Sequence, residues 1–307
     1  MQRAPVVTGA LLAAAVAVLA GAAAGPVRLS PEQRAAVLKD IDKDRTETQA
    51  WLKSAPTSYL ATISRRDFEG RPALTVGRAA DNDIRVDDPA FEAHHLRVTV
   101  EGDRFRVDAV DPSARFVSDK TPARSAIVEP SMLDVGRFKL RLSHQGFPGI
   151  IVFDPQSPHF RKYKGLKYFP PNLDLRYELP LTRNPKPETI VILSTRGNQR
   201  RATRVGWFEF AVRGTPVKLE AVNLLEPGVP EDELGIFFRD ATTGKESYPL
   251  GRYVDVKKLP DGRYLLDFNF TYNPACAYSD HYNCPIPPRT NVLPVAIDAG
   301  EMDAHYH

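Results

Sequence analysis

The sequence predicts a mostly β protein with an N-terminal helix, a first β-sandwich and a second β-sheet domain closed by a disulfide loop. Three observations predict this class. Short alternating apolar runs, cut by turn residues, fill the chain from residue 60 onward. The 27 prolines leave few long stretches with helical periodicity. The only two cysteines, Cys276 and Cys284, stand near the C-terminus with seven residues between them.

Residues 1–24 have the pattern of a secretory signal peptide. Arg3 precedes an apolar run over residues 6–24, and small residues suit cleavage just before Ala23 or Gly25. We therefore expect an exported protein, periplasmic or secreted. An uncleaved anchor is the alternative, because the run is nearly long enough to span a bilayer. No other stretch approaches that length, so no membrane span is expected after signal removal.

The export signal also bears on the cysteines. In an oxidising compartment, two cysteines this close in the sequence predict one disulfide that closes a short loop. Such a loop contributes about 2–3 kcal/mol in the chain-entropy description. Metal or redox chemistry is the alternative, but the spacing is neither a C-x-x-C motif nor half of a zinc site.

Charge and motifs exclude several function classes. The chain has 41 Lys and Arg against 38 Asp and Glu, which predicts no general attraction to nucleic acid. The sequence lacks a G-x-S-x-G elbow, an H-E-x-x-H motif and a phosphate-binding loop. The histidines are mostly isolated. We expect no cofactor and no metal. The sequence does not identify the partner, and an envelope glycan or peptide is one candidate.

A helix is predicted over residues 30–54. Ser30 is a good N-cap, Pro31 suits the first helical position, and Gln33 completes a capping box. Pro56 follows its end. The apolar stripe is narrow, so we expect the helix to lie on a sheet with most of its surface in water; the stripe consists of Ala36, Val37, Ile41, Trp51 and Leu52.

Residues 57–143 have the strand spacing of a β-sandwich. They resemble forkhead-associated (FHA) domains, which bind phosphothreonine peptides, at Thr75-Val76-Gly77-Arg78, Asn82-Asp83-Ile84 and His94-His95-Leu96. Glu92, however, stands where those domains place a phosphate-binding serine, three residues before His95. Residues 111–115 replace their Asn-Gly-Thr turn. Because a carboxylate repels phosphate, we expect a degenerate sandwich that does not read phosphopeptides.

Residues 149–301 are expected to form the second β domain, followed by a tail over residues 302–307. A segment rich in proline and aromatic residues precedes the strands and is expected to cross between the two sheets. Residues 195–201 are predicted to form an exposed basic hairpin tip. The predicted strands span residues 173–179, 189–193, 205–212, 217–222, 234–238, 253–256 and 264–270.

The C-terminal part carries a second resemblance. The run from Phe238 to Lys245, the Cys-Pro-x-Pro-Pro segment at Cys284 and Ala299-Gly300-Glu301 resemble the bacterial domain-of-unknown-function family 1684. The likeness extends in order over about residues 30–301. The family implies no settled activity.

The densest polar set also lies in this part of the chain. Strand alternation places Asp267 and Asn269 on one face, which we expect to point away from the core. The ligand-binding candidates are Arg239, Asp240, Tyr248, Arg252, Asp267, Asn269, Tyr272, Asn273, Asn291 and Glu301.

Two interpretations of this set are open. In the favoured one, Arg239 and Arg252 neutralise Asp240 and Asp267 in a structural network. In the other, the set lines a groove in which tyrosines, Tyr278 among them, stack on sugar rings. The predicted function is a non-catalytic envelope binding or scaffold protein. The alternative is a hydrolase of a glycan or peptide that uses two of the C-terminal carboxylates, Glu301 among them.

Overall fold

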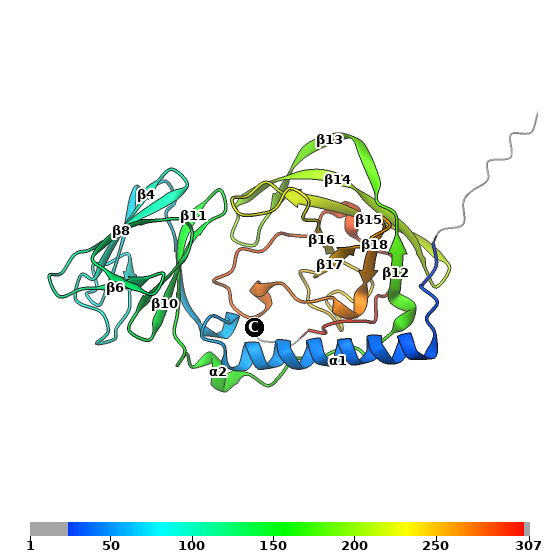
Figure 1. Cartoon of the computed structure of the whole chain (residues 1–307), viewed down its shortest axis with the longest axis horizontal. Coiled ribbons are helices and arrows are strands. Elements are labelled where there is room, and N and C mark those ends of the chain that lie inside the picture. The colour runs from blue at the N-terminus through cyan, green and yellow to red at the C-terminus, as the bar shows by residue number, and fades with distance from the viewer. Residues whose placement is uncertain (1–23, 304–307) are drawn as a thin grey trace, which may run out of the picture.

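The computed structural model describes residues 24–303, so the predicted signal peptide lies almost entirely outside the described residues. Strands make up 42% and helices 15%, which confirms the mostly β class with one long N-terminal helix. A sandwich of two sheets lies on one side and a larger sheet on the other, with the helix along one edge of the larger body (Figure 1). Among residues 24–303, no helix is both long and apolar enough to cross a membrane.

The N-terminal helix, α1 (Pro31–Ser54), begins where the sequence predicted. The Ser30 hydroxyl accepts a hydrogen bond from the Gln33 N–H, and the Gln33 side chain accepts one from the Ser30 N–H at 2.8 Å. This capping box satisfies two amide groups that the first helical turn leaves without partners.

Helix α1 does not lie on a sheet as expected. Its buried residues Val37 and Ile41 pack against Leu173 and Phe270, and Leu52 packs beside Tyr278. These partners belong to short 3-10 helices and loops of the C-terminal part, which no strand periodicity can reveal. The expectation that most of the helix faces water is correct, since only three of its residues are buried.

The first β body is a sandwich of two sheets around a shared apolar core. Alternation produces this core, because Leu96 and Val98 are buried and Arg97 between them is exposed. All pairings are antiparallel except that of β2 with β3. One sheet has the order β1 (Thr62–Asp67), β11 (Pro148–Phe153), β10 (Phe138–His144), β9 (Met132–Val135), β6 (Phe116–Ser118), β7 (Thr121–Ala123). The other has the order β3 (Ile84–Arg85), β2 (Ala73–Gly77), β4 (Leu96–Glu101), β5 (Arg104–Ala109), β8 (Ser125–Val128).

Strand β11 lies in the sandwich, although the sequence assigned residues from 149 onward to the second domain. It pairs with both β1 and β10. Ile150 and Val152 are fully buried in the sandwich core, and Ile151 faces the other way. A run that is apolar on both faces gives no sign of which sheet it joins.

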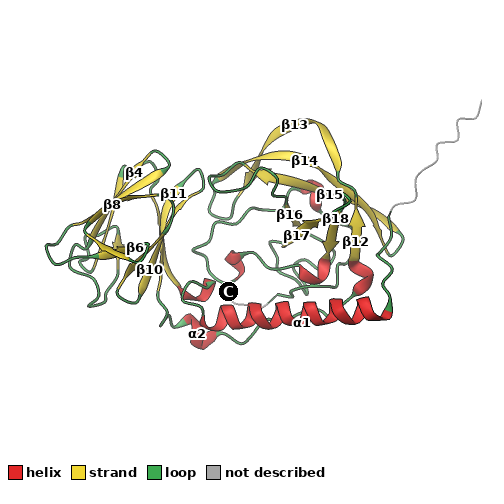
Figure 2. Ribbon diagram, viewed as in Figure 1, coloured by secondary structure: helices red, strands yellow, loops and turns green. Residues whose placement is uncertain are grey.

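The second β body is a seven-stranded antiparallel sheet (Figure 2). Its order is β12 (Arg176–Leu179), β18 (Tyr264–Asp267), β17 (Arg252–Lys258), β16 (Gly235–Phe238), β15 (Thr215–Leu224), β14 (Gln199–Val212), β13 (Thr182–Leu193). Its largest buried side chains include Tyr177, Phe208, Phe210, Phe238 and Phe268. Each strand predicted between residues 173 and 270 overlaps one of these seven.

The remaining helical segments are short and connect the strands. They are α2 (His159–Lys162) and the 3-10 helices η1 (Tyr59–Ala61), η2 (Leu173–Leu175), η3 (Phe268–Phe270), η4 (Ala275–Ala277) and η5 (Arg289–Asn291). Helix η3 corrects one prediction, because the expected strand over residues 264–270 ends at Asp267. The Asp267 carboxylate accepts a hydrogen bond from the Asn269 N–H and so caps the turn that replaces the strand.

The hairpin tip between β13 and β14 is mostly exposed, as the sequence predicted, but one arginine of the predicted tip, Arg200 on β14, is not solvated. Arg200 is buried, forms an ion pair with Glu226 and donates to the Ser194 hydroxyl at 2.8 Å. Arg196 forms an ion pair with Asp67 of the sandwich at 3.4 Å. These arginines therefore hold the loop and join the two β bodies.

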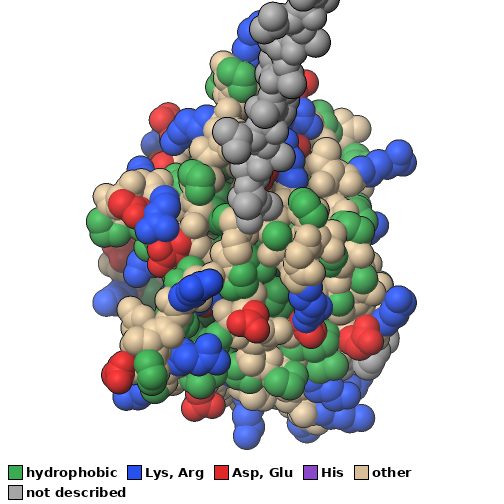
Figure 3. All heavy atoms as spheres, turned by 90° about the vertical axis from the view of Figure 1, so that its right-hand side faces the viewer, with side chains coloured by type: hydrophobic (Ala, Val, Ile, Leu, Met, Phe, Trp, Pro, Cys, Tyr) green, Lys and Arg blue, Asp and Glu red, His purple; other side chains and the backbone are tan. Residues whose placement is uncertain are grey.

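The charged groups are mixed over the surface. In Figure 3, basic and acidic side chains are interspersed with uncharged ones on the visible face. This agrees with the formal net charge of +3 for the whole chain.

Candidate functional site

Two of the predicted site residues, Asp240 and Arg252, form a closed structural network. The Arg252 side chain is fully buried, pairs with Asp240 at 3.4 Å and donates to the carbonyl groups of Ile297 and Ala299 at 2.7 and 2.6 Å. Asp240 accepts the Ile297 N–H at 2.6 Å. This network attaches the last segment of the chain to the sheet, as the favoured interpretation expected.

Asp267 is also part of a structural network, with a different partner. It forms an ion pair with Arg176 on the neighbouring strand β12 and accepts the Asn269 side-chain amide at 2.8 Å. Asp267 and Asn269 are both buried, so their polar groups are satisfied by protein partners. The predicted partner Arg239 instead donates to the Leu250 carbonyl at 2.8 Å.

Tyr248 and Asn291 are used for packing and backbone contacts. The Tyr248 hydroxyl donates to the Cys276 carbonyl at 3.2 Å. The buried Asn291 side chain accepts the Glu220 N–H at 2.7 Å and donates to the Phe237 carbonyl at 2.9 Å. Neither residue lines the cavity described next.

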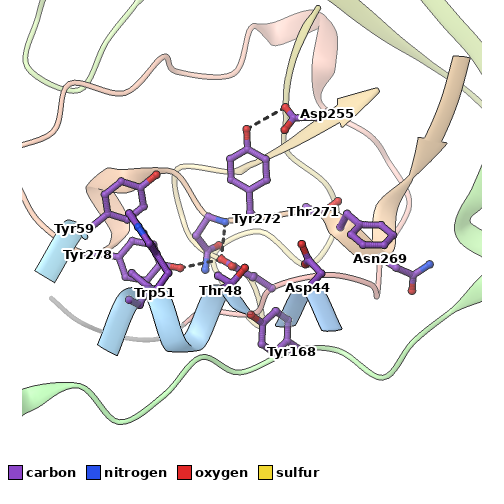
Figure 4. Close-up of a pocket in the computed structure, with 14 residues that line it drawn as sticks. Asp44, Thr48, Trp51, Tyr59, Tyr168, Asp255, Asn269, Thr271, Tyr272 and Tyr278 are labelled. Carbon is purple, nitrogen blue, oxygen red and sulfur yellow. Dashed lines mark hydrogen bonds between the residues drawn. The ribbon is translucent and has the colours of Figure 1, made fainter. Parts of the chain in front are cut away.

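A cavity of about 400 Å³ lies between α1 and the C-terminal part of the chain. It brings together four of the ten candidates, Asn269, Tyr272, Asn273 and Glu301, together with Tyr278. Figure 4 shows Asp44, Thr48 and Trp51 projecting from α1 toward this set. The remaining lining residues are Leu52, Tyr59, Tyr168, Asp255, Phe270 and Thr271.

Glu301 is the most perturbed acid of the cavity. Its Oε2 accepts the Asn273 N–H at 2.8 Å and the Tyr278 hydroxyl at 2.9 Å. Burial raises its pKa to about 7, and these hydrogen bonds oppose the rise only in part. Among the described residues, no lysine or arginine forms an ion pair with it. The acid form of this carboxyl therefore persists to a much higher pH than that of an ordinary glutamate.

Two further carboxyl groups line the cavity, and nothing in the sequence selected them. Asp255 on β17 accepts the Tyr272 hydroxyl at 3.1 Å, and desolvation raises its pKa. The pKa of Asp44 on α1 is also raised. Desolvation is the larger cause, and the negative charge of Glu47 is the smaller one. Asp44 lies in α1, which the sequence predicted to have most of its surface in water.

Aromatic rings form one wall of the cavity. Trp51 and Tyr59 pack edge to face with ring centroids 4.9 Å apart, and Tyr59 stacks on Tyr278 at 5.5 Å. Trp51 remains 38% exposed, so its ring is accessible. The hydroxyl of Tyr168 is buried and has no hydrogen-bond partner among the described residues. Trp51 and Tyr59 lie more than 200 residues from Tyr278, so only the fold brings them together.

The cysteines and the histidines add no further site. Cys276 and Cys284 are both buried and approach to 3.3 Å, which is longer than the bond of about 2.05 Å in a disulfide. The predicted disulfide stays a prediction. Within residues 24–303, no group of three His, Cys, Asp or Glu side chains is arranged to hold a metal ion.

The sandwich loops that would hold phosphate in an FHA domain are occupied by internal hydrogen bonds. The Glu92 carboxylate accepts the Ser113 hydroxyl at 2.9 Å. His95 accepts the Glu92 N–H through Nδ1 at 3.0 Å and contacts the Arg115 carbonyl through Nε2 at 2.8 Å. A carboxylate at this position disfavours a phosphate group.

Comparisons with known proteins agree with this division of the chain. Residues 74–132 match the FHA domain, and residues 161–302 match a family described as protein of unknown function, DUF1684. The C-terminal part of the chain is therefore similar to DUF1684, and residues 161–302 are called the DUF1684 domain below. No curated protein matches the chain.

A solved structure is similar to the chain over half its length. It is the solution NMR structure of an uncharacterized protein of Haloarcula marismortui, which is 37% identical. The match covers 50% of this chain and 85% of that protein, with a TM-score of 0.39. The DUF1684 domain contributes one side of the cavity, with lining residues between Tyr168 and Glu301. Helix α1, outside the matched residues, contributes the opposite wall.

Proposed function

We propose that this chain is an exported, non-catalytic binding protein whose cavity between α1 and the DUF1684 domain holds a sugar-like ligand. The observation that carries the proposal is the combination of an accessible aromatic wall with carboxyl and amide groups in one cavity. Sugars present apolar C–H faces that pack on aromatic rings, and hydroxyl groups that hydrogen-bond to carboxylates and amides. The volume of about 400 Å³ lies in the range of small-molecule sites.

The two tryptophans allow a direct test. Trp51 lines the cavity, whereas Trp207 lies on β14, where its ring contacts Lys218. In a Trp207→Phe variant the fluorescence reports on Trp51 alone. We expect a saturable change when N-acetylglucosamine or its oligomers are added, and loss of binding by calorimetry in Trp51→Ala. If Trp51→Ala binds these sugars as the wild type does, the proposed site is wrong.

Export and the disulfide are part of the same proposal. The supporting observations are the apolar N-terminal run and the close approach of the two cysteines. Mass spectrometry of the exported protein should find its first residue between about residues 21 and 27. The Ala24 carbonyl accepts the Ala211 N–H at 2.9 Å, so a chain that starts at or before Ala24 keeps this bond. Two free thiols in the native exported protein would contradict the disulfide.

One observation favours hydrolysis as a second candidate. A carboxyl group with a pKa of about 7, such as Glu301, can donate a proton to the oxygen that leaves a glycosidic bond. A second carboxylate, Asp255 or Asp44, would take a proton from a water molecule, and the remaining OH group would add to the sugar carbon. Asp240 and Asp267 do not fit this role, because Arg252 and Arg176 neutralise them.

Aryl glycosides with a chromogenic leaving group test this candidate. Hydrolysis should weaken as the pH rises above about 7, because the acid form of Glu301 is lost. Glu301→Gln should abolish it and still bind sugar. If wild-type protein binds sugars and releases no chromophore, the chain is a binding protein only.

A further inference from the structure

A second cavity, of about 420 Å³, lies between the sandwich and the DUF1684 sheet. The sandwich contributes Arg65, Arg141 and Ile151 to its lining. The DUF1684 side contributes Arg200, Tyr253 and Tyr282, among others. Neither β body forms this space alone.

Arg65 and Arg141 occupy one row across the sandwich sheet. Arg65 on β1 and Arg141 on β10 both pair with Ile151 of β11, which runs between these strands. Side chains of paired residues project from the same face of a sheet. Two guanidinium groups therefore flank Ile151 on the face that meets the DUF1684 domain.

The hydrogen-bonding capacity of these two arginines is not filled by the protein. The buried Arg65 donates to Asp67 through Nε at 2.8 Å, but its Nη2 has no acceptor among the described residues. Arg141 is exposed, lies over the Phe153 ring at 5.3 Å and forms no ion pair within residues 24–303. Arg200, the third arginine of the cavity, is already paired with Glu226.

The arginine row is close to the aromatic cavity. Tyr272 and Asp255 line both cavities, so the two spaces share one wall. The charge of Arg141 also acts on Tyr59, whose ring belongs to the aromatic wall. Burial is the main influence and raises the pKa of Tyr59, while Arg141 lowers it. Because the two cavities share Tyr272 and Asp255, a ligand held at the aromatic wall can extend a charged group toward Arg141.

We propose that the site selects a sugar that bears an oxyanion, a carboxylate or a phosphate, with its ring at the aromatic wall and its anion at Arg141 and Arg65. A guanidinium group presents paired N–H donors that match the oxygens of such a group. This inference rests on the proposed function for the position of the sugar ring. It assigns to the sandwich a role in recognition through its sheet face, away from the loops that FHA domains use.

Three probes that share one sugar separate the contributions. N-acetylglucosamine is neutral, N-acetylmuramic acid adds a carboxylate, and N-acetylglucosamine 6-phosphate adds a phosphate. By calorimetry or protein-observed NMR, we expect one acidic probe to bind about tenfold or more tighter than the neutral sugar, as a charge-assisted hydrogen bond allows. The acidic probe with the larger gain in affinity shows whether the site prefers a carboxylate or a phosphate.

Arg141→Gln is the test variant, because Arg141 is exposed and its replacement leaves the core intact. We expect this variant to bind the neutral sugar as the wild type does and to lose the preference for the acid. Arg97→Gln, on the exposed side of β4 in the other sheet, is the matched control and should keep the preference.

The outcomes separate this inference from the proposed function. Equal affinity for all three probes, or an acid preference that survives in Arg141→Gln, overturns the oxyanion site and leaves sugar binding intact. Failure of all three probes to bind overturns both. Binding of inorganic phosphate alone, abolished in Arg141→Gln, would show an anion site without a sugar and so would also contradict the inference.

Discussion

Replacing Glu301 by glutamine should stabilise the protein at alkaline pH and leave its stability almost unchanged in acid. Folding moves the pKa of this carboxyl from its ordinary value of 4.5 to about 7. Because the folded-state value is the higher one, the protonated form is the one that the fold favours. The stability associated with Glu301 is therefore complete below about pH 4.5 and is lost as the pH rises through about 7.

The size of the effect follows from the two pKa values. Each pKa unit corresponds to about 1.4 kcal/mol, so ionised Glu301 costs about 3 kcal/mol once both states are deprotonated. The amide oxygen of the variant side chain can still accept the bonds from Asn273 and Tyr278, which both end on Oε2 of the native side chain. We expect Glu301→Gln to exceed the wild type by up to about 3 kcal/mol near pH 8.5 and to differ by about 0.5 kcal/mol near pH 4.5.

Urea unfolding of both proteins across this pH range is the appropriate assay, because other acids titrate equally in both and cancel in the difference. Glu129→Gln, at an exposed position between β8 and β9, controls for the removal of one negative charge. A difference between Glu301→Gln and wild type that stays constant with pH would refute the raised pKa. A wild type more stable than the variant at pH 8.5 would refute it as well.

Three further substitutions test structural assignments. Asp267→Ala leaves the Arg176 guanidinium without its partner and should lower the free energy of unfolding by about 3–5 kcal/mol. The control Asp261→Ala lies in an exposed turn and should leave the melting temperature nearly unchanged. If the two variants melt at the same temperature, the structural role of Asp267 is wrong. Gly149→Ala would place a Cβ 2.4 Å from Asp67 Oδ1, which Arg65 holds in place. We expect the free energy of unfolding to fall by about 1–3 kcal/mol, measured with urea. A urea midpoint equal to that of the wild type would contradict this prediction. Ser30→Ala removes the N-cap of α1 and should cost about 1 kcal/mol, measured by thermal unfolding; no loss would show that the capping box contributes nothing.

Local sequence signals predicted most of the secondary structure. The helix start at Ser30 and the strand positions follow from capping and alternation, which depend on residues a few positions apart. The place of β11 could not be predicted in this way. A continuous apolar run fits any sheet, and only its pairing with β1 and β10 assigns β11 to the sandwich.

The candidate site was predicted only in part, for a similar reason. Polar residue types selected Glu301 and Tyr272, which line the cavity, but they selected Asp240 and Arg252 as well. A buried ion pair and an open carboxyl group look alike in a sequence, because the difference lies in the distance to a neighbour. Trp51 was assigned to a packing stripe, since nothing along the chain indicates that it lines a cavity together with Tyr278.

The contacts of α1 have a consequence for how the protein is made. The helix is synthesised before both β bodies, yet it packs against Leu173, Phe270 and Tyr278, which follow it by more than a hundred residues. Contacts of such high sequence separation form late, because the intervening chain must first be closed into a loop. During synthesis α1 emerges long before its partners, with its apolar stripe uncovered. The cavity beside α1 is therefore complete only once Glu301 has been made, and a chain that ends between residues 153 and 278 has every strand of the sandwich but lacks part of the surface that covers the helix.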